Sequence, residues 1–184
     1  MKKNQSTLII IIVLFVVTAC GSSKPAYTVN QIEDLKKLIE HGSFLIEAEF
    51  ANPLATQSMN AVSSAGLLPP GSAVNRINLM GTNNFLEVKG DSVSANLPYY
   101  GERQIAGAYN NSDVGIQFKG VPEDFKMSYN EKKEAYEMKF SAKNKSEIFD
   151  INAIIFPNNT VSLYVNSSQR LTINYQGMLK EISE

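Results

Sequence analysis

Residues 151–165 read INAIIFPNNTVSLYV, and the pattern of apolar residues in this stretch indicates the fold. An apolar residue occupies every second position on both sides of the segment Pro157-Asn158-Asn159. Alternation with a period of two is typical of a strand that buries one face, and Pro and Asn are common turn residues. The stretch therefore predicts two antiparallel strands joined by a tight turn.

The same alternation recurs along most of the chain and predicts about ten strands. They are centred on residues 44–50, 77–79, 85–88, 93–97, 114–118, 125–129, 136–140, 151–155, 161–165 and 171–175. Parallel strands need crossovers of a dozen or more residues, so strands joined by short loops predict an antiparallel meander. We expect this meander to form a curled sheet or a closed barrel, with a two-layer sandwich as the alternative.

One amphipathic helix precedes the strands, with Thr28 as its expected N-cap and Gly42 as its C-cap. Its apolar stripe has helical spacing and consists of Ile32, Leu35, Leu38 and Ile39. The predicted fold class is therefore all-β with one N-terminal helix, in a single domain over residues 28–184. Residues 52–73 lack a clear period, and we expect there either a variable surface loop or a flap over one end of a barrel.

Composition excludes several classes of function. In the 184 residues, 17 Lys and Arg stand against 18 Asp and Glu, which gives a net charge of −1. Without a field of one sign, a nucleic acid partner is not expected. A single Cys and a single His exclude an internal disulfide and zinc sites of the Cys₂His₂ or Cys₄ kind, and no cofactor is expected.

The N-terminus has the pattern of a targeting signal over residues 1–19. Lys2 and Lys3 precede an apolar run from Leu8 to Val17, which as a helix would rise only about 15 Å, half the thickness of a bilayer core. Such a run is typical of a cleaved secretory signal peptide.

The segment Val17-Thr18-Ala19-Cys20-Gly21 resembles the lipobox of bacterial lipoproteins. The resemblance implies that Cys20 carries a diacylglycerol and a further acyl chain such as palmitate, with residues 20–27 as a lipidated tether. Gly21 stands where inner-membrane lipoproteins carry Asp, so we expect the inner leaflet of the outer membrane, with the domain facing the periplasm. Exposure on the cell surface is the alternative.

Several motifs carry a second resemblance. Leu97-Pro98-Tyr99-Tyr100-Gly101 is followed by Tyr109, by Gly115-Ile116-Gln117-Phe118 and, near the C-terminus, by Tyr175-Gln176-Gly177. This pattern resembles the domain of unknown function 4251 family, lipobox-bearing proteins chiefly from Gram-negative gut anaerobes. Because that family has no assigned activity, the resemblance implies a fold and a location but no reaction.

The chemistry-bearing residues do not predict an enzyme. His41 lies at the expected helix C-terminus, where a cation interacts favourably with the helix dipole. Glu47 and Glu49 lie two residues apart on one strand, as on the solvated face of a sheet. A hydrolase that uses this carboxylate pair is the second alternative function.

The candidate binding surface consists of Tyr99, Tyr100, Arg103 and Tyr109. Tyr combines an apolar ring with a polar tip, and Arg offers planar paired donors, so these residues suit a small ligand or a protein partner. In a packing role, the tyrosines would instead cap the core. Ser92, in the segment Asp91-Ser92-Val93, is a possible O-glycan acceptor, and a plain hairpin turn is the alternative.

These features predict a lipid-anchored cell-envelope protein, attached to its membrane through Cys20. We expect non-catalytic binding of an apolar or amphipathic small ligand within the curl of the sheet. An envelope protein–protein interaction or structural module is the alternative. An open apolar cavity would favour the ligand, and a filled core the protein partner.

Overall fold

The computed structural model describes residues 27–104 and 115–182. In them, helix α2 (Val29–His41) precedes ten strands, and helix α3 (Gln57–Ser64) follows the first of them. The strands are β1 (Ser43–Asn52), β2 (Ile77–Asn78), β3 (Phe85–Lys89), β4 (Ser92–Leu97), β5 (Ile116–Gly120), β6 (Glu123–Asn130), β7 (Ala135–Asn144), β8 (Glu147–Ile155), β9 (Thr160–Ser167) and β10 (Ile173–Glu181).

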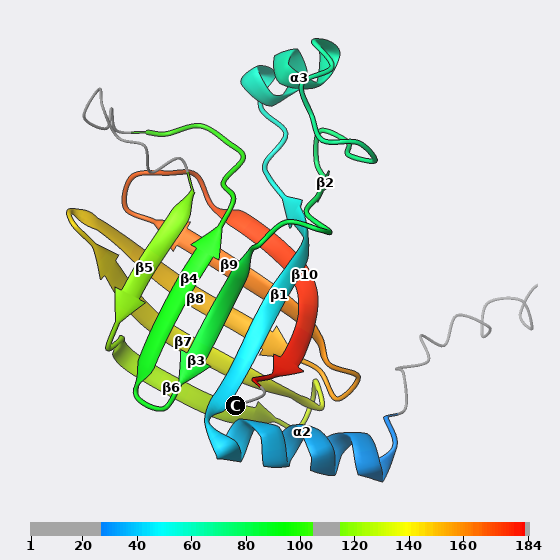
Figure 1. Cartoon of the computed structure of the whole chain (residues 1–184), viewed down its shortest axis with the longest axis vertical. Helices are drawn as coiled ribbons and strands as arrows, with labels where there is room; N and C mark the ends of the chain where they lie inside the picture. The colour runs from blue at the N-terminus through cyan, green and yellow to red at the C-terminus, as the bar shows by residue number, and fades with distance from the viewer. Residues whose placement is uncertain (1–26, 105–114, 183–184) are drawn as a thin grey trace, which may run out of the picture.

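All ten strands belong to one antiparallel sheet, in the order β5-β4-β3-β1-β10-β9-β8-β7-β6, with the short β2 paired to β1. The first and last long strands therefore pair in the middle of the sheet. The two edges, β5 and β6, are consecutive in sequence. The sheet curls into an open half-barrel (Figure 1), which confirms the all-β class and the curled form rather than a closed barrel or a sandwich.

Aromatic side chains hold the curl together where β5 lies over β7 and β8. The ring of Phe118 lies 6.1 Å from that of Phe140 and 5.7 Å from that of Phe149. Asn144, the last residue of β7, donates its side-chain N–H to the carbonyl oxygen of Gln117 at 2.7 Å. These contacts replace the strand pairing that a closed barrel would have at this position.

The β1–β10 pair contains an irregularity that requires Gly177. The register of the two strands shifts between Ala48 and Phe50, and Gly177 lies opposite Ala48. A Cβ atom on Gly177 would lie 2.0 Å from the carbonyl oxygen of Glu47, far inside van der Waals contact. Glycine is therefore a steric requirement where the two strands approach most closely.

Helix α2 lies across one end of the half-barrel (Figure 1). It begins as predicted, because Thr28 and Gln31 form a capping box, and it ends at Gly42. Leu35 is buried in the core. The amide of Gly90, in the β3–β4 turn, donates to the carbonyl oxygen of Gly42 at 2.9 Å, which fixes this turn to the end of the helix.

The half-barrel has two ends, which carry different loops. The α2 end carries α2, the β3–β4 turn, which bonds to Gly42, and the link between β5 and β6, since Gly120 pairs with Val93 (Figure 1). The Arg170 end carries residues 98–104, the β7–β8 turn and the link between β9 and β10. Strand β5 runs from the Arg170 end to the α2 end, and its five residues span about 16 Å.

The structure refines the predicted elements in detail. The second strand is only Ile77–Asn78, and the last begins at Ile173 and continues to Glu181. Residues 52–73 include the helix α3, which lies beyond the end of β1 (Figure 1). Neither helix of the described part of the chain has the length and hydrophobicity of a membrane span. The predicted signal peptide, Cys20 and Tyr109 lie outside the described residues.

Candidate functional site

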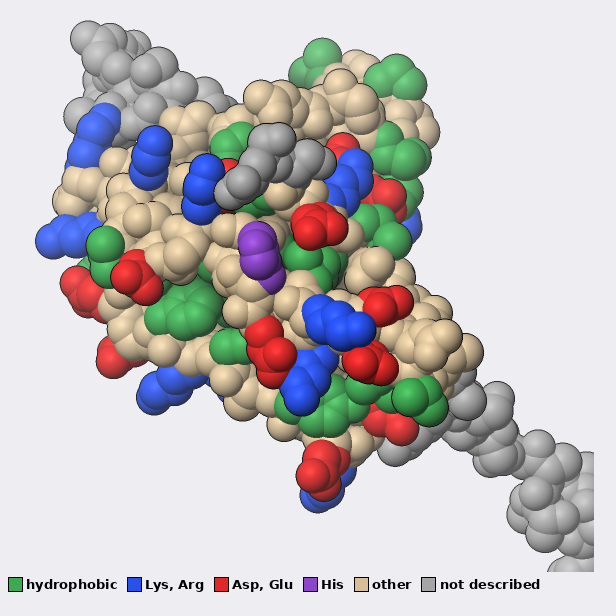
Figure 2. All heavy atoms as spheres, turned by 60° about the horizontal axis from the view of Figure 1, so that its bottom comes forward, with side chains coloured by type: hydrophobic (Ala, Val, Ile, Leu, Met, Phe, Trp, Pro, Cys, Tyr) green, Lys and Arg blue, Asp and Glu red, His purple; other side chains and the backbone are tan. Residues whose placement is uncertain are grey.

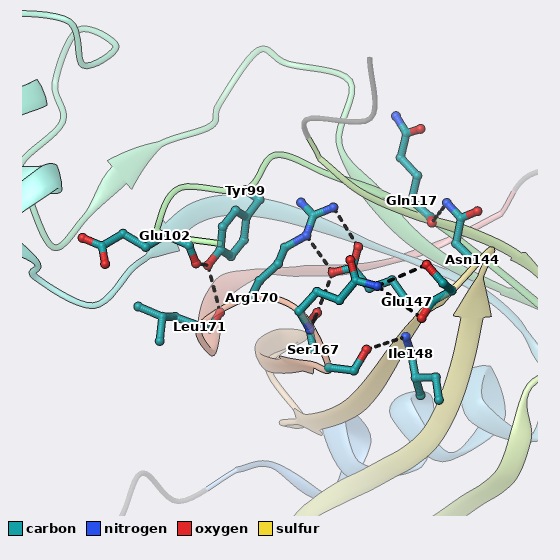
Figure 3. Close-up of polar contacts among 12 residues, drawn as sticks. Tyr99, Glu102, Gln117, Asn144, Glu147, Ile148, Ser167, Arg170 and Leu171 are labelled. Carbon is teal, nitrogen blue, oxygen red and sulfur yellow. Dashed lines mark hydrogen bonds and ion pairs between the residues drawn. The ribbon is translucent and has the colours of Figure 1, made fainter. Parts of the chain in front are cut away.

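A buried ion pair organises the Arg170 end (Figure 3). Arg170 comes from the link between β9 and β10, and Glu147 begins β8. The guanidinium Nε lies 2.7 Å from Glu147 Oε1, and Nη2 lies 3.0 Å from Oε2. Only 3% of Arg170 and 8% of Glu147 are exposed, so the pair has left water almost completely.

The protonation of Glu147 follows from these contacts. Burial alone would raise the pKa of the Glu147 carboxyl, because it disfavours the charged form. Hydrogen bonds donated by Arg170 and by the Ser167 hydroxyl, together with the positive charge of Arg170, outweigh burial and lower this pKa. Glu147 is therefore ionised at neutral pH and holds Arg170 in place.

Tyr99 ties the chain after β4 to this ion pair. Its hydroxyl lies 3.0 Å from the carbonyl oxygen of Glu102 and 3.1 Å from that of Leu171 (Figure 3). The guanidinium of Arg170 lies 5.1 Å from the centre of the Tyr99 ring. Gly101 has φ 152°, and a Cβ there would lie 2.7 Å from the Tyr99 hydroxyl, so a larger residue at this position would displace the Tyr99 ring. These contacts match the packing role weighed for the tyrosines.

The remaining residues of the predicted binding surface lie beside Tyr99. Tyr100 is half-buried and packs against the core, and burial raises the pKa of its hydroxyl. Arg103 is exposed, and its backbone pairs with that of Arg170. The structure thus brings Tyr99, Tyr100 and Arg103 to one end of the half-barrel.

Glu102 lies near the start of α3. The side chains of Ser58 and Thr56, in the first turn and at the N-cap of α3, lower the pKa of the exposed Glu102 carboxyl.

The cavity beside the ion pair is small and polar. It has a volume of about 40 Å³, and its walls include Arg103, Gln117, Asn144, Glu147 and Arg170. Ligand sites for small organic molecules measure about 300–1,000 Å³. This cavity therefore has room for bound water but not for an amphipathic ligand.

A larger, apolar groove lies at the α2 end. It has a volume of about 410 Å³, and its walls are Gly90, Asp91, Val93, Val121, Pro122 and Phe125. Val121 is 76% exposed and Phe125 is 40% exposed, and they are two of the nine large apolar side chains that are exposed among the described residues. The groove therefore combines the size of a ligand site with an apolar lining.

A bulge at the start of β6 shapes one wall of this groove. The register of β6 on β7 shifts between Glu123 and Lys126, and Asp124 within this shift has φ 53°. Bulges bend a strand and re-aim its side chains. The ring of Phe125 consequently stacks on Phe140 at 5.8 Å while its other side remains open to the groove.

Side chains fill the inside of the curl. Large residues there are almost fully buried, among them Phe44, Ile46, Leu86, Leu97, Ile116, Phe149 and Tyr175. The filled curl has no room for the ligand expected there, and a filled core is what the protein-partner alternative predicts. Hollows outside the curl include the groove of about 410 Å³ at the rim and more polar ones of about 530 and 670 Å³ beside α2 and over β3–β5.

The other residues singled out in the sequence have separate places. Ser92 is exposed at the start of β4, directly after the β3–β4 turn, and remains a predicted acceptor. His41 is the last residue of α2. The Glu47 carboxylate pairs with Lys180 across the β1–β10 ladder, and Glu49 lies further along β1. In the described ranges, no group of three or more His, Cys, Asp or Glu side chains is placed to hold a metal.

The sequence interpretation missed Arg170 and Glu147, because neither residue belongs to a motif and 23 positions separate them. It also missed the groove, whose walls come from residues 90–93 and 121–125.

Comparisons with known proteins agree with the fold. The model of the family described as "Domain of unknown function (DUF4251)" matches residues 28–179. The chain is also similar to the crystal structure of a DUF4251 family protein from Bacteroides eggerthii DSM 20697. The two share 13% sequence identity and a TM-score of 0.54, over 83% of this chain and 88% of the other. No curated protein matches.

Proposed function

We propose that this chain, which belongs to the DUF4251 family of domains of unknown function, is a lipid-anchored envelope protein that binds an apolar or amphipathic small ligand without catalysis. The observation that supports this proposal best is the groove of about 410 Å³ at the α2 end. It leaves Val121 and Phe125 in water on a domain that otherwise buries most of its large apolar side chains.

The walls of the groove suit an amphipathic molecule. Val121, Pro122 and Phe125 offer apolar contacts, and covering a side chain of this size contributes about 1.5–3 kcal/mol. Asp91 and the turn at Gly90 lie on the opposite wall, where a polar group of the ligand would find hydrogen-bonding partners.

The location belongs to the same proposal. We infer lipidation at Cys20 from the lipobox pattern, and the inner leaflet of the outer membrane from Gly21. Two or more acyl chains are needed for a durable anchor, and the lipobox chemistry supplies them.

A titration with a fluorescent fatty acid tests the binding. The chain from Gly21 onward is suitable, because the buried core of the described residues lies between Leu35 and Leu179. We expect saturable binding near one ligand per chain. In Val121→Asp, loss of about 1.5 kcal/mol of apolar contact would weaken binding about tenfold. The matched control is Ser64→Asp, an exposed site on α3 that should bind like the wild type. No saturation, or equal affinity in Val121→Asp, would refute the groove as the site.

A protein partner at the Arg170 end is the second candidate. It is favoured by the exposure of Glu102 and Arg103 beside the half-buried Tyr100. A photo-crosslinking residue at Tyr100 should then capture one defined envelope protein in cells. Capture of none would exclude this candidate.

A further inference from the structure

The geometry points to a source for the groove's ligand. We infer that it is an acyl chain of a phospholipid in the anchoring membrane, and that the α2 end of the domain faces that membrane. This inference rests on the proposed function, because it needs both the anchor at Cys20 and an apolar ligand in the groove.

The tether joins the domain at the α2 end. Thr28, the N-cap of α2, follows Cys20 by eight residues. Eight residues span at most about 29 Å when fully extended, which limits how far the domain can lie from the bilayer. The chain enters the domain through α2, so along the chain the α2 end comes before the Arg170 end (Figure 1).

The groove belongs to the same end as the tether. Helix α2 starts at Val29 and, with 13 residues, runs about 20 Å across this end. At its far side, the carbonyl oxygen of Gly42 accepts the hydrogen bond from Gly90, and Gly90 is itself part of the groove wall. Helix α2 and the hydrogen bond between Gly42 and Gly90 thus join the tether to the groove wall.

Exposed apolar side chains at this end fit an apolar partner. Val29 is 78% exposed, next to the tether, and Val121 is 76% exposed in the groove, whereas the exposed apolar side chains elsewhere include Leu67 after α3 at 72% and Ile148 at 46%. Figure 2 looks toward this end and shows hydrophobic side chains in patches between acidic and basic ones. Such a mixed surface has no strong field of one sign, so attraction to an anionic headgroup is not its main feature.

An acyl chain is favoured over a dissolved amphiphile by this placement. A lipid chain already has apolar surroundings in the bilayer, so it moves into the groove without first crossing water if the groove opens toward the membrane. The driving force is then the removal of Val121 and Phe125 from water.

Quenching by labelled lipids tests this inference on the full lipidated protein. The sulfur of Cys20 is bonded to lipid in that form, so Val121→Cys carries the only free thiol. The protein is labelled there with a small fluorophore and reconstituted into phosphatidylethanolamine–phosphatidylglycerol vesicles that contain a phospholipid with a nitroxide on its acyl chain. The matched control is Ser64→Cys on α3, an exposed site outside the α2 end.

We expect at least threefold stronger quenching at position 121 than at position 64. Equal quenching at the two positions would overturn the inference. A blue shift of the emission at position 121, which reports apolar surroundings, would also overturn the inference if it came without quenching. The groove would then hold the acyl chains of Cys20 itself.

Two further readouts separate this inference from the proposed function. Flotation of the wild-type protein with the vesicles reports on the anchor, and the fatty acid titration reports on the groove. If both succeed and quenching at positions 121 and 64 is equal, the inference fails while the proposed function stands. If flotation or titration fails, the proposed function fails and the inference fails with it.

Discussion

Replacing Arg170 by Met should destabilise the domain strongly. The substitution leaves the carboxylate of Glu147, only 8% exposed, without the two hydrogen bonds at 2.7 and 3.0 Å that compensate its burial. Removing one partner of a buried ion pair costs about 3–5 kcal/mol. That is a large share of the roughly 5–15 kcal/mol by which domains are stable. The ring of Tyr99 also loses its guanidinium neighbour.

Urea unfolding of the chain from Gly21 onward at pH 7 measures this cost. The double variant Arg170→Met/Glu147→Leu removes both charges, so it should recover most of the lost free energy. The control is Lys36→Met on α2, whose pair with Glu40 is exposed and 3.8 Å long. That variant should lie within about 0.5 kcal/mol of the wild type.

A loss below about 1 kcal/mol in Arg170→Met would contradict this explanation, because a buried carboxylate would then need no partner. The explanation would also be contradicted if the double variant lost as much unfolding free energy as the two single variants lose together. In that case the two residues contribute independently, and the ion pair does not organise this end.

Three further predictions concern stability. Gly177→Ala should lower the free energy of unfolding by about 3 kcal/mol or more, because its Cβ would lie 2.0 Å from the Glu47 carbonyl oxygen. A thermal midpoint equal to that of the wild type would contradict the close approach of the two strands. Tyr175→Phe removes the hydroxyl that donates to the Pro98 carbonyl oxygen at 2.7 Å. The free energy of unfolding in urea should fall by about 1–3 kcal/mol. An unchanged urea midpoint would show that this oxygen finds another donor. Because the folded state lowers the pKa of Glu147, its stabilising contribution is complete above the unfolded pKa of about 4.5 and is lost as pH falls through the folded value. Acid titration of unfolding should therefore show a steeper loss in the wild type than in Glu147→Gln, and identical slopes would be inconsistent with the lowered pKa.

The sequence predicts the strands well because each strand buries one face, and a period of two follows directly from that burial. The helix over Val29–His41 was equally predictable from Thr28 and Gly42. The order of the strands was not predictable in this way. Alternation of apolar residues does not indicate which strands pair with each other. Pairing of β1 with β10 depends on the close approach of their backbones at Gly177.

The candidate site was predictable only in part. The tyrosine motif groups residues that interact locally, because Tyr99 and Gly101 are close in sequence, but its role as a binding surface stays a prediction. The ion pair and the groove each join segments that are distant in sequence. The groove also depends on the bulge at Asp124, which no hydrophobic pattern indicates.

A photo-crosslinking residue at Val121 of the full chain, activated in living cells, would show directly what occupies the groove. We expect an adduct whose mass identifies a membrane phospholipid, with little of that adduct from the same residue at Ser64 on α3. Equal lipid adducts at both positions, or adducts with protein alone at Val121, would contradict the binding of an acyl chain from the anchoring membrane in this groove.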